Sequence, residues 1–198
     1  MAAALQGSFV PTRGPVFPSV HDEPDLDEFH ELPAPINVIV KLLEAKGEEA
    51  VHGFFVDRVT GDGSLPECKP TPSIHEQYPL ECHMTRRVGG GWTQKILLAR
   101  FGVRVGSGHH SASCKSDTWP IGLPQDYRCL HYKWRASLVE RLRWGLQNSG
   151  SIETRWGQEA TSYIQYIGEK QRIPIDDYAL GCKMIGASRP IIYPRTDR

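Results

Sequence analysis

The chain has 198 residues, a length that fits one ordinary domain or one domain with a tail. Hydrophobic residues make up 39% and charged residues 23%, so the composition supports a packed core and excludes a wholly disordered chain. Lys and Arg together number 23, as do Asp and Glu, which excludes a uniformly basic nucleic-acid-binding protein but leaves room for a local basic patch.

The N-terminus lacks the apolar segment of a secretory signal, and no run approaches the roughly 20 apolar residues of a membrane-spanning helix. An odd number of cysteines at irregular spacing is a poor disulfide framework; they are Cys68, Cys82, Cys114, Cys129 and Cys182. We therefore expect free thiols in an intracellular protein, cytoplasmic or nuclear, that is neither secreted nor anchored in a membrane.

Charge separates residues 1–35 from the rest of the chain. They hold six acids, one base and six prolines, so residues 36–198 carry an excess of about five bases. A Pro-rich acidic segment buries too little surface to offset the entropy lost on ordering it. We predict a flexible, disordered tail over residues 1–35 and a single globular domain over residues 36–198.

Within this tail, residues 20–35 place Leu26, Phe29 and Leu32 among acidic side chains. This pattern is typical of a short peptide that docks into the groove of a partner protein. A solvated tail with no partner explains it as well.

The first half of the domain has the patterns of β-strands. Apolar residues alternate from Ile36 to Leu42, and residues 51–59 are rich in β-formers. Residues 80–88 and 92–105 also alternate and are separated by three glycines, which predicts a β-hairpin with a basic outer face.

A loop of about 21 residues without periodicity follows at 106–126. Apolar residues at helical spacing then predict a helix over about 135–147. We expect short strands at 152–156, 161–167, 178–185 and 189–193. The predicted fold is α+β and rich in β-structure, with one main helix packed on an antiparallel sheet.

Reactive side chains gather in the region 106–131. A nucleophilic Cys or a metal-activated water in a hydrolase or nuclease would use His109, His110, Cys114 and His131. Zinc would use His110, Cys114, Cys129 and His131, although this spacing matches no standard zinc motif. An ordinary loop with surface histidines explains these residues as well, so we expect no cofactor.

Basic residues concentrate in the middle third of the chain, interleaved with Tyr and Trp. Such side chains pair with phosphates while aromatic faces stack on bases or lie at lipid headgroups, although a solvated surface is the plain alternative. The candidate binding residues are Arg86, Arg87, Lys95, Arg100, Arg104, Lys133, Arg135, Arg141 and Arg143.

These patterns favour a non-enzymatic interaction or assembly protein. Its basic face would bind RNA or an anionic membrane surface, or the protein would form a homo-oligomer, while residues 20–35 recruit a protein partner. Small adaptor proteins and viral structural proteins of the matrix type share this outline. The alternative is the Cys/His-dependent hydrolase or metal-dependent nuclease with its site in the region 106–131.

Overall fold

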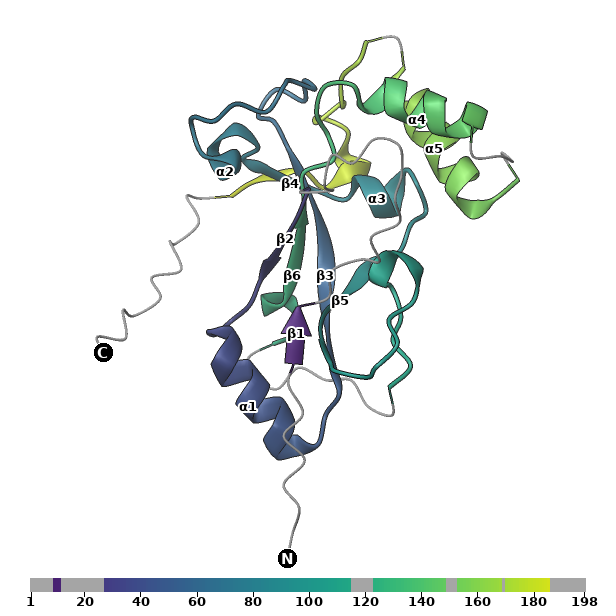
Figure 1. Cartoon of the computed structure of the whole chain (residues 1–198). Helices are drawn as coiled ribbons and strands as arrows, with labels where there is room; N and C mark the ends of the chain where they lie inside the picture. The colour runs from purple at the N-terminus through teal and green to yellow at the C-terminus, as the bar shows by residue number, and fades with distance from the viewer. Residues whose placement is uncertain (1–8, 12–26, 115–122, 149–152, 169, 186–198) are drawn as a thin grey trace, which may run out of the picture. The chain divides into compact units, whose positions relative to one another are not determined.

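The computed structural model confirms the predicted α+β fold rich in β-structure (Figure 1). It describes residues 9–11, 27–114, 123–148, 153–168 and 170–185. These residues form seven strands and five α-helices. Three of the helices have 11 to 13 residues, whereas the prediction had one main helix.

The chain forms two compact units. Unit 1 comprises residues up to Phe55 and Gln94–Leu130, and unit 2 comprises Val56–Thr93 and residues from His131 onward. Strands β3 (Ala50–Val59) and β6 (Arg128–His131) contribute residues to both units. The predicted single domain over 36–198 stays a prediction.

In unit 1, the first half of β3 pairs antiparallel with β5 (Gln94–Arg100), and β5 pairs antiparallel with β1 (Phe9–Pro11). Strand β2 (Glu28–Glu31) pairs with β6. Two segments of the predicted flexible tail are therefore strands of the sheet. The other tail residues, up to residue 26, lie outside the described part of the chain.

The strand predicted at the start of the domain is a helix, α1 (Ile36–Lys46). Ile39 and Leu43, four residues apart, are its buried side chains, whereas Ile36 and Val38 are exposed. Pro35 precedes the helix, and Gly47 ends it with a φ of 68°, which is the left-handed conformation common at helix C-termini. Short apolar runs fit both periodicities, and here the spacing of four decides.

In unit 2, residues Asp57–Val59 of β3 pair antiparallel with β4 (Leu80–Cys82), which pairs antiparallel with β7 (Lys183–Met184). The one-turn helices α2 (Ile74–Gln77) and α3 (Met84–Arg87) flank β4 in the sequence. The predicted hairpin is therefore wrong, because β4 and β5 each pair with β3 and not with each other.

The predicted helix at 135–147 is confirmed as α4 (Leu138–Asn148), which packs against α5 (Arg155–Ile167). Strands had been predicted where α5 lies. Thr154 caps α5 by accepting a hydrogen bond from the Gly157 N–H, and the side of α5 bearing Ala160 and Tyr163 is buried. Of the two last predicted strands, 178–185 holds a 3₁₀ turn and β7, and 189–193 lies outside the described residues.

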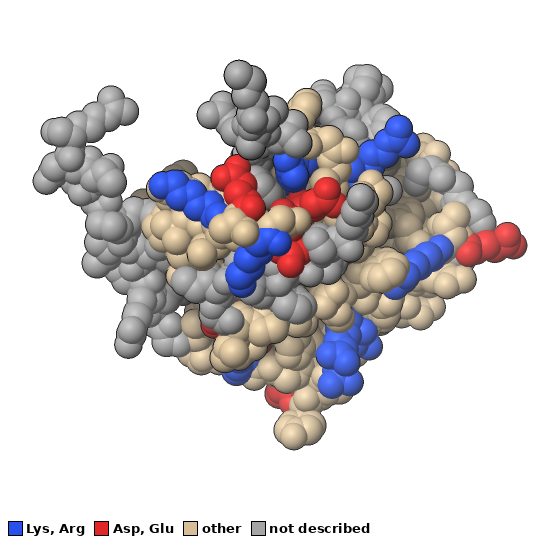
Figure 2. All heavy atoms as spheres, turned by 90° about the horizontal axis from the view of Figure 1, so that it is seen from below, with Lys and Arg blue, Asp and Glu red and all other residues tan. Residues whose placement is uncertain are grey.

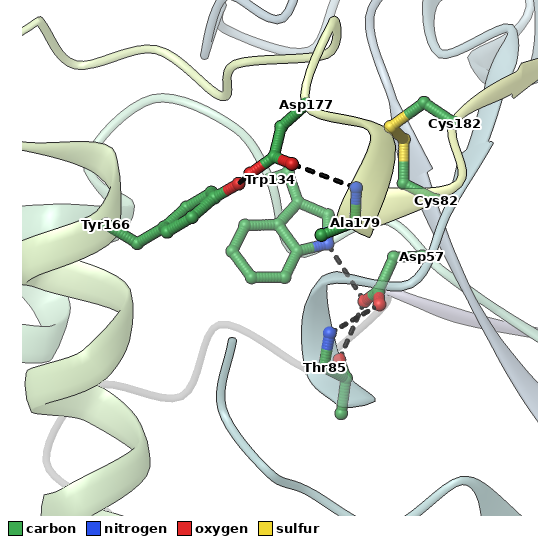
Figure 3. Close-up of a disulfide and its surroundings, with 8 residues drawn as sticks. All are labelled: Asp57, Cys82, Thr85, Trp134, Tyr166, Asp177, Ala179 and Cys182. Atoms are coloured by element: carbon green, nitrogen blue, oxygen red, sulfur yellow. Dashed lines mark hydrogen bonds between the residues drawn. A yellow bond between two sulfur atoms is a disulfide. The ribbon is translucent and has the colours of Figure 1, made fainter. Parts of the chain in front are cut away.

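A disulfide joins Cys82 of β4 to Cys182, which corrects the expectation that all thiols are free (Figure 3). The two residues are 100 positions apart in the sequence, and the pairing of β4 with β7 brings them together. Cys68, Cys114 and Cys129 form no disulfide. Among the described helices, none is long and apolar enough to cross a bilayer.

Removal of the disulfide is expected to destabilise unit 2. A cross-link that closes a loop of this length restricts the unfolded chain, and the corresponding stabilisation is about 4.7 kcal/mol. We expect Cys182→Ala, or a reductant, to lower the free energy of unfolding by roughly that amount in urea titrations. The exposed free thiol provides the control: Cys68→Ala should leave stability and its sensitivity to reductant unchanged. Equal stability of oxidised and reduced protein would contradict the prediction.

Candidate functional site

The centre of unit 2 is the buried carboxylate of Asp57, on β3 (Figure 3). It accepts hydrogen bonds from the Thr85 N–H and Oγ1, both at 2.7 Å, and from the Trp134 Nε1 at 2.9 Å. His131 Nδ1 lies 3.1 Å from Oδ1. A carboxylate only accepts, so this His131 nitrogen carries the proton.

Burial raises the pKa of Asp57, but the hydrogen bonds and charge of His131 and the hydrogen bonds of Thr85 outweigh it, so the net shift is downward. The carboxylate is therefore ionised at neutral pH. A buried ionised group with several donors is costly to alter, because any change leaves desolvated donors without an acceptor.

Asp57 determines where α3 begins. Thr85 is the second residue of that helix, and both its backbone and its hydroxyl are bonded to the carboxylate. The exposed Arg86 and Arg87 follow directly. The Gly91 N–H then donates to the Thr85 carbonyl at 2.8 Å, which fixes the turn that leads to Trp92.

Trp92 is exposed by 52% and lies against Arg155, the first residue of α5. The Arg155 guanidinium carbon is 4.8 Å from the centre of the Trp92 ring, and its Nη2 donates to the Gly90 carbonyl at 3.1 Å. A guanidinium held over an indole face is a cation–π contact. The contact joins the turn after α3 to the start of α5.

The next residue, Trp156, lies against the backbone of α4. A Cβ at Gly145 would come within 2.4 Å of the Trp156 ring, so only glycine leaves room for it. Trp156 still exposes 46% of its surface, and Trp144 exposes 59%. Helical spacing places Arg141, four residues before Gly145, on the same side of α4, and Arg143 on the opposite side.

Unit 2 therefore carries a surface of exposed Trp and Arg side chains from three connected elements. We name it the Trp/Arg surface; it consists of Arg86, Arg87, Trp92, Arg141, Trp144, Arg155 and Trp156.

The predicted basic residues do not all belong to an exposed face. Arg86, Arg87, Arg104, Arg141 and Arg143 are exposed, and Arg100 and Arg135 are half-buried. Lys95 is buried and paired with Glu28, and Lys133 lies 4.4 Å from the centre of the Tyr163 ring and 4.0 Å from Glu159. In the view of Figure 2, Lys and Arg side chains are separated by uncharged and acidic ones.

The residues of the predicted peptide motif have different environments. Phe29, on β2, is exposed by 40%, whereas Leu32 is half-buried and packs against the hydrophobic core of unit 1. Leu26 lies outside the described residues.

The residues of the alternative enzyme site have separate partners. His110 Nδ1 lies 2.8 Å from the Gln94 carbonyl oxygen, and the Cys114 thiol is 3.9 Å from that of Ala112. Cys129 donates to Glu28, and His131 to Asp57. Among the described residues of either unit taken alone, no three His, Cys, Asp or Glu ligand atoms lie within 4.8 Å of one another. The hydrolase or nuclease thus stays a prediction without a supporting arrangement.

Unit 1 contains its own cluster of titratable groups around Glu28 of β2. The Glu28 carboxylate pairs with Lys95 of β5 and accepts a hydrogen bond from the Cys129 thiol of β6. The Lys95 ammonium also lies 5.2 Å from the centre of the Phe55 ring. Burial, and after it the negative charge of Glu28, raises the pKa of the Cys129 thiol. This thiol is therefore not a nucleophile at neutral pH.

His109 lies close to this ion pair with a φ of 59°, a conformation that non-glycine residues adopt infrequently. Burial and the charge of Lys95 lower its pKa, and Glu28 opposes them. The pKa of His30 on β2 is also lowered, mainly by loss of solvent around the ring. Taken over the whole residue, His30 is exposed and His109 is half-buried, so His109 is the better group for a test of pH dependence.

The sequence analysis missed Asp57, Trp92, Arg155 and Trp156 as important residues. Asp57 lies in a strand of β-formers and is marked by no motif. The start of α5 was detectable, since Thr154 is a good N-cap and apolar residues recur at three- and four-residue spacing from Ala160 to Ile167.

Comparison with known proteins supplies no family: no family model matches the chain, and neither a curated protein nor a solved structure is significantly similar to it.

Substitution Asp57→Asn is expected to destabilise the protein by about 3 kcal/mol, because the amide presents a donor to groups that themselves donate. The exposed Asp176→Asn is the control and should change stability little. Because the folded pKa of Asp57 is lowered, its stabilisation is present above the unfolded value of about 3.9 and is lost as the pH falls through the folded value. Urea unfolding across pH measures both effects, and a loss no larger than that of the control would contradict the prediction.

His109 is expected to titrate below the unfolded value of about 6.5. The unfolded chain then binds a proton that the folded chain does not, so stability is full above about pH 6.5 and falls as the pH drops toward the folded pKa. NMR titration of the imidazole in folded and urea-unfolded protein measures the two values. His109→Gln should make the stability less dependent on pH in that range, and a folded midpoint at or above the unfolded one would contradict the prediction.

Proposed function

We propose that the protein is a non-enzymatic interaction protein that binds an anionic partner through exposed arginines of unit 2. The observation that carries this proposal is the exposure of Arg86 and Arg87 on α3 and of Arg141 and Arg143 on α4. These four were among the predicted binding residues.

A charged side chain attracts a ligand only where no opposite charge of the protein already neutralises it. Lys95 pairs with Glu28 and Lys133 with Glu159, so these two lysines stabilise the fold. The four arginines are exposed to solvent, and an exposed guanidinium presents a planar fork of donors that fits phosphate in two-point contacts.

The position of the arginines supports binding rather than a merely solvated surface. Arg86 and Arg87 follow Thr85, whose backbone and hydroxyl are held by the buried Asp57. A short helix fixed in this way presents its charges with little loss of backbone entropy on binding. Recruitment of a protein through residues 20–35 and self-association stay separate predictions.

Binding to a polyanion is expected to depend on salt and on these arginines. The double variant Arg86→Ala/Arg87→Ala should weaken binding to heparin or an oligonucleotide severalfold and lower the slope of log affinity against log salt by about 1 to 2.

The matched control removes two charges from the exposed face of α1, through Lys41→Ala/Lys46→Ala. It should leave affinity and slope nearly unchanged. Absence of polyanion binding at low salt, or equal losses in the two double variants, would contradict the proposed function.

A further inference from the structure

Three of the five tryptophans in the chain are exposed side chains of unit 2. Trp92, Trp144 and Trp156 expose 52%, 59% and 46% of their surfaces, whereas the neighbouring Trp134 is fully buried in the core. The core of unit 2 thus buries one indole ring, that of Trp134, while the other three indole rings face solvent. Grouped exposed aromatic surface marks an interaction site.

Contacts link the elements that carry the three tryptophans. Trp92 lies against Arg155, and the next residue, Trp156, lies on the α4 backbone at Gly145. The helix α4 also carries the exposed Trp144. We call Trp92, Arg155, Trp156 and Trp144 the strip.

Resting on the proposed function, we infer that the anionic partner is single-stranded nucleic acid, RNA in the first instance. Its bases stack on Trp92, Trp156 and Trp144, and its phosphates pair with Arg86, Arg87 and Arg141. Aromatic faces with guanidinium groups beside them are the chemistry by which single strands bind without sequence preference.

The composition of the surface distinguishes this partner from a membrane. Helices that lie in a lipid interface combine basic residues with Trp, Leu and Phe on the apolar face, and the Leu and Phe side chains insert among the acyl chains. Among the described residues of unit 2, the large exposed hydrophobic side chains are Trp92, Trp144, Trp156, Tyr178 and Met184. Among these described residues, no exposed Leu, Ile, Val or Phe accompanies the tryptophans, so the described surface offers aromatic faces without such side chains beside them.

The strip is also held in place before a ligand arrives. Arg155 is fixed by its hydrogen bond to Gly90, and Thr154 caps the helix that carries Arg155 and Trp156. On the other side, Gly91 is bonded to Thr85, which is bonded to Asp57. Rigid aromatic anchors lose little conformational entropy on binding.

The test uses the full chain and fluorescently labelled oligo(U) of 20 nucleotides, with binding followed by anisotropy at low salt. Trp92→Ala should weaken binding about fivefold or more, since each stacked base contributes about 1 to 3 kcal/mol. Tyr178→Ala is the matched control, because it removes a 98% exposed aromatic side chain of unit 2 that is not part of the strip.

An abasic oligonucleotide of the same length separates base stacking from charge. It keeps the phosphates, so the inference predicts that it binds at least tenfold more weakly than oligo(U) and is indifferent to Trp92→Ala. Equal binding of the abasic strand would overturn the inference and leave the proposed function intact. Absence of binding to either strand would overturn both.

Two further experiments test a membrane as the partner and the role of Trp156. Vesicles of phosphatidylserine and phosphatidylcholine test a membrane, and preference for vesicles over oligo(U) would overturn the inference. Trp156→Ala removes a side chain packed on Gly145 and risks unfolding α5. The variant Trp156→Phe is therefore tested beside Trp156→Ala, and thermal unfolding checks that both are folded. Trp156→Phe keeps an aromatic ring and should retain most of the affinity for oligo(U). Wild-type affinity in a folded Trp92→Ala protein would overturn the inference.

Discussion

One buried carboxylate organises unit 2. Asp57 accepts hydrogen bonds from Thr85 and Trp134 (Figure 3). It also faces the Nδ1 of His131. A desolvated charge is tolerated only where donors surround it, so the positions of these partners are mutually dependent. Thr85 is the second residue of the helix that carries Arg86 and Arg87, and Trp134 packs edge-to-face on Tyr163 of α5 with ring centres 5.0 Å apart. The buried Asp57 carboxylate thus helps to position the elements that carry the exposed side chains of unit 2.

Unit 1 is organised by a different charge, that of Lys95 on β5. Its ion pair with Glu28 joins β2 to the sheet, and a second pair between Glu31 and Arg128 at 3.1 Å acts on the same strand. Composition alone assigned these glutamates to a solvated tail, because it counts acids without knowing which bases face them. The Glu31–Arg128 pair lies on the paired strands β2 and β6, where opposite charges stabilise the pairing.

The sequence predicts what depends on local periodicity and misses what depends on distant partners. The α4 helix was predictable because Leu138, Leu142 and Leu146 repeat at four-residue spacing. The run from Ile36 to Leu42 fits both a strand and a helix, and only the burial of Ile39 with Leu43 decides. The disulfide joins residues 100 positions apart, and Asp57 meets donors 28 and 77 residues away. Exposed and paired bases are likewise indistinguishable in sequence, so the predicted set combines exposed arginines with the half-buried Arg100 and Arg135 and the buried Lys95.

Gly145 shows how the surface is built at a cost to local stability. A glycine inside a helix is about 1 kcal/mol less favourable than alanine, and nothing in the backbone of α4 requires it, since the helix continues through it without a break. What requires it is Trp156, whose ring occupies the space of the missing Cβ. A buried indole in that position would be ordinary core packing. This indole keeps nearly half of its surface in solvent, so the close approach supports an exposed ring in a fixed orientation. The glycine is therefore explained by the packing of Trp156 and not by the conformation of the helix.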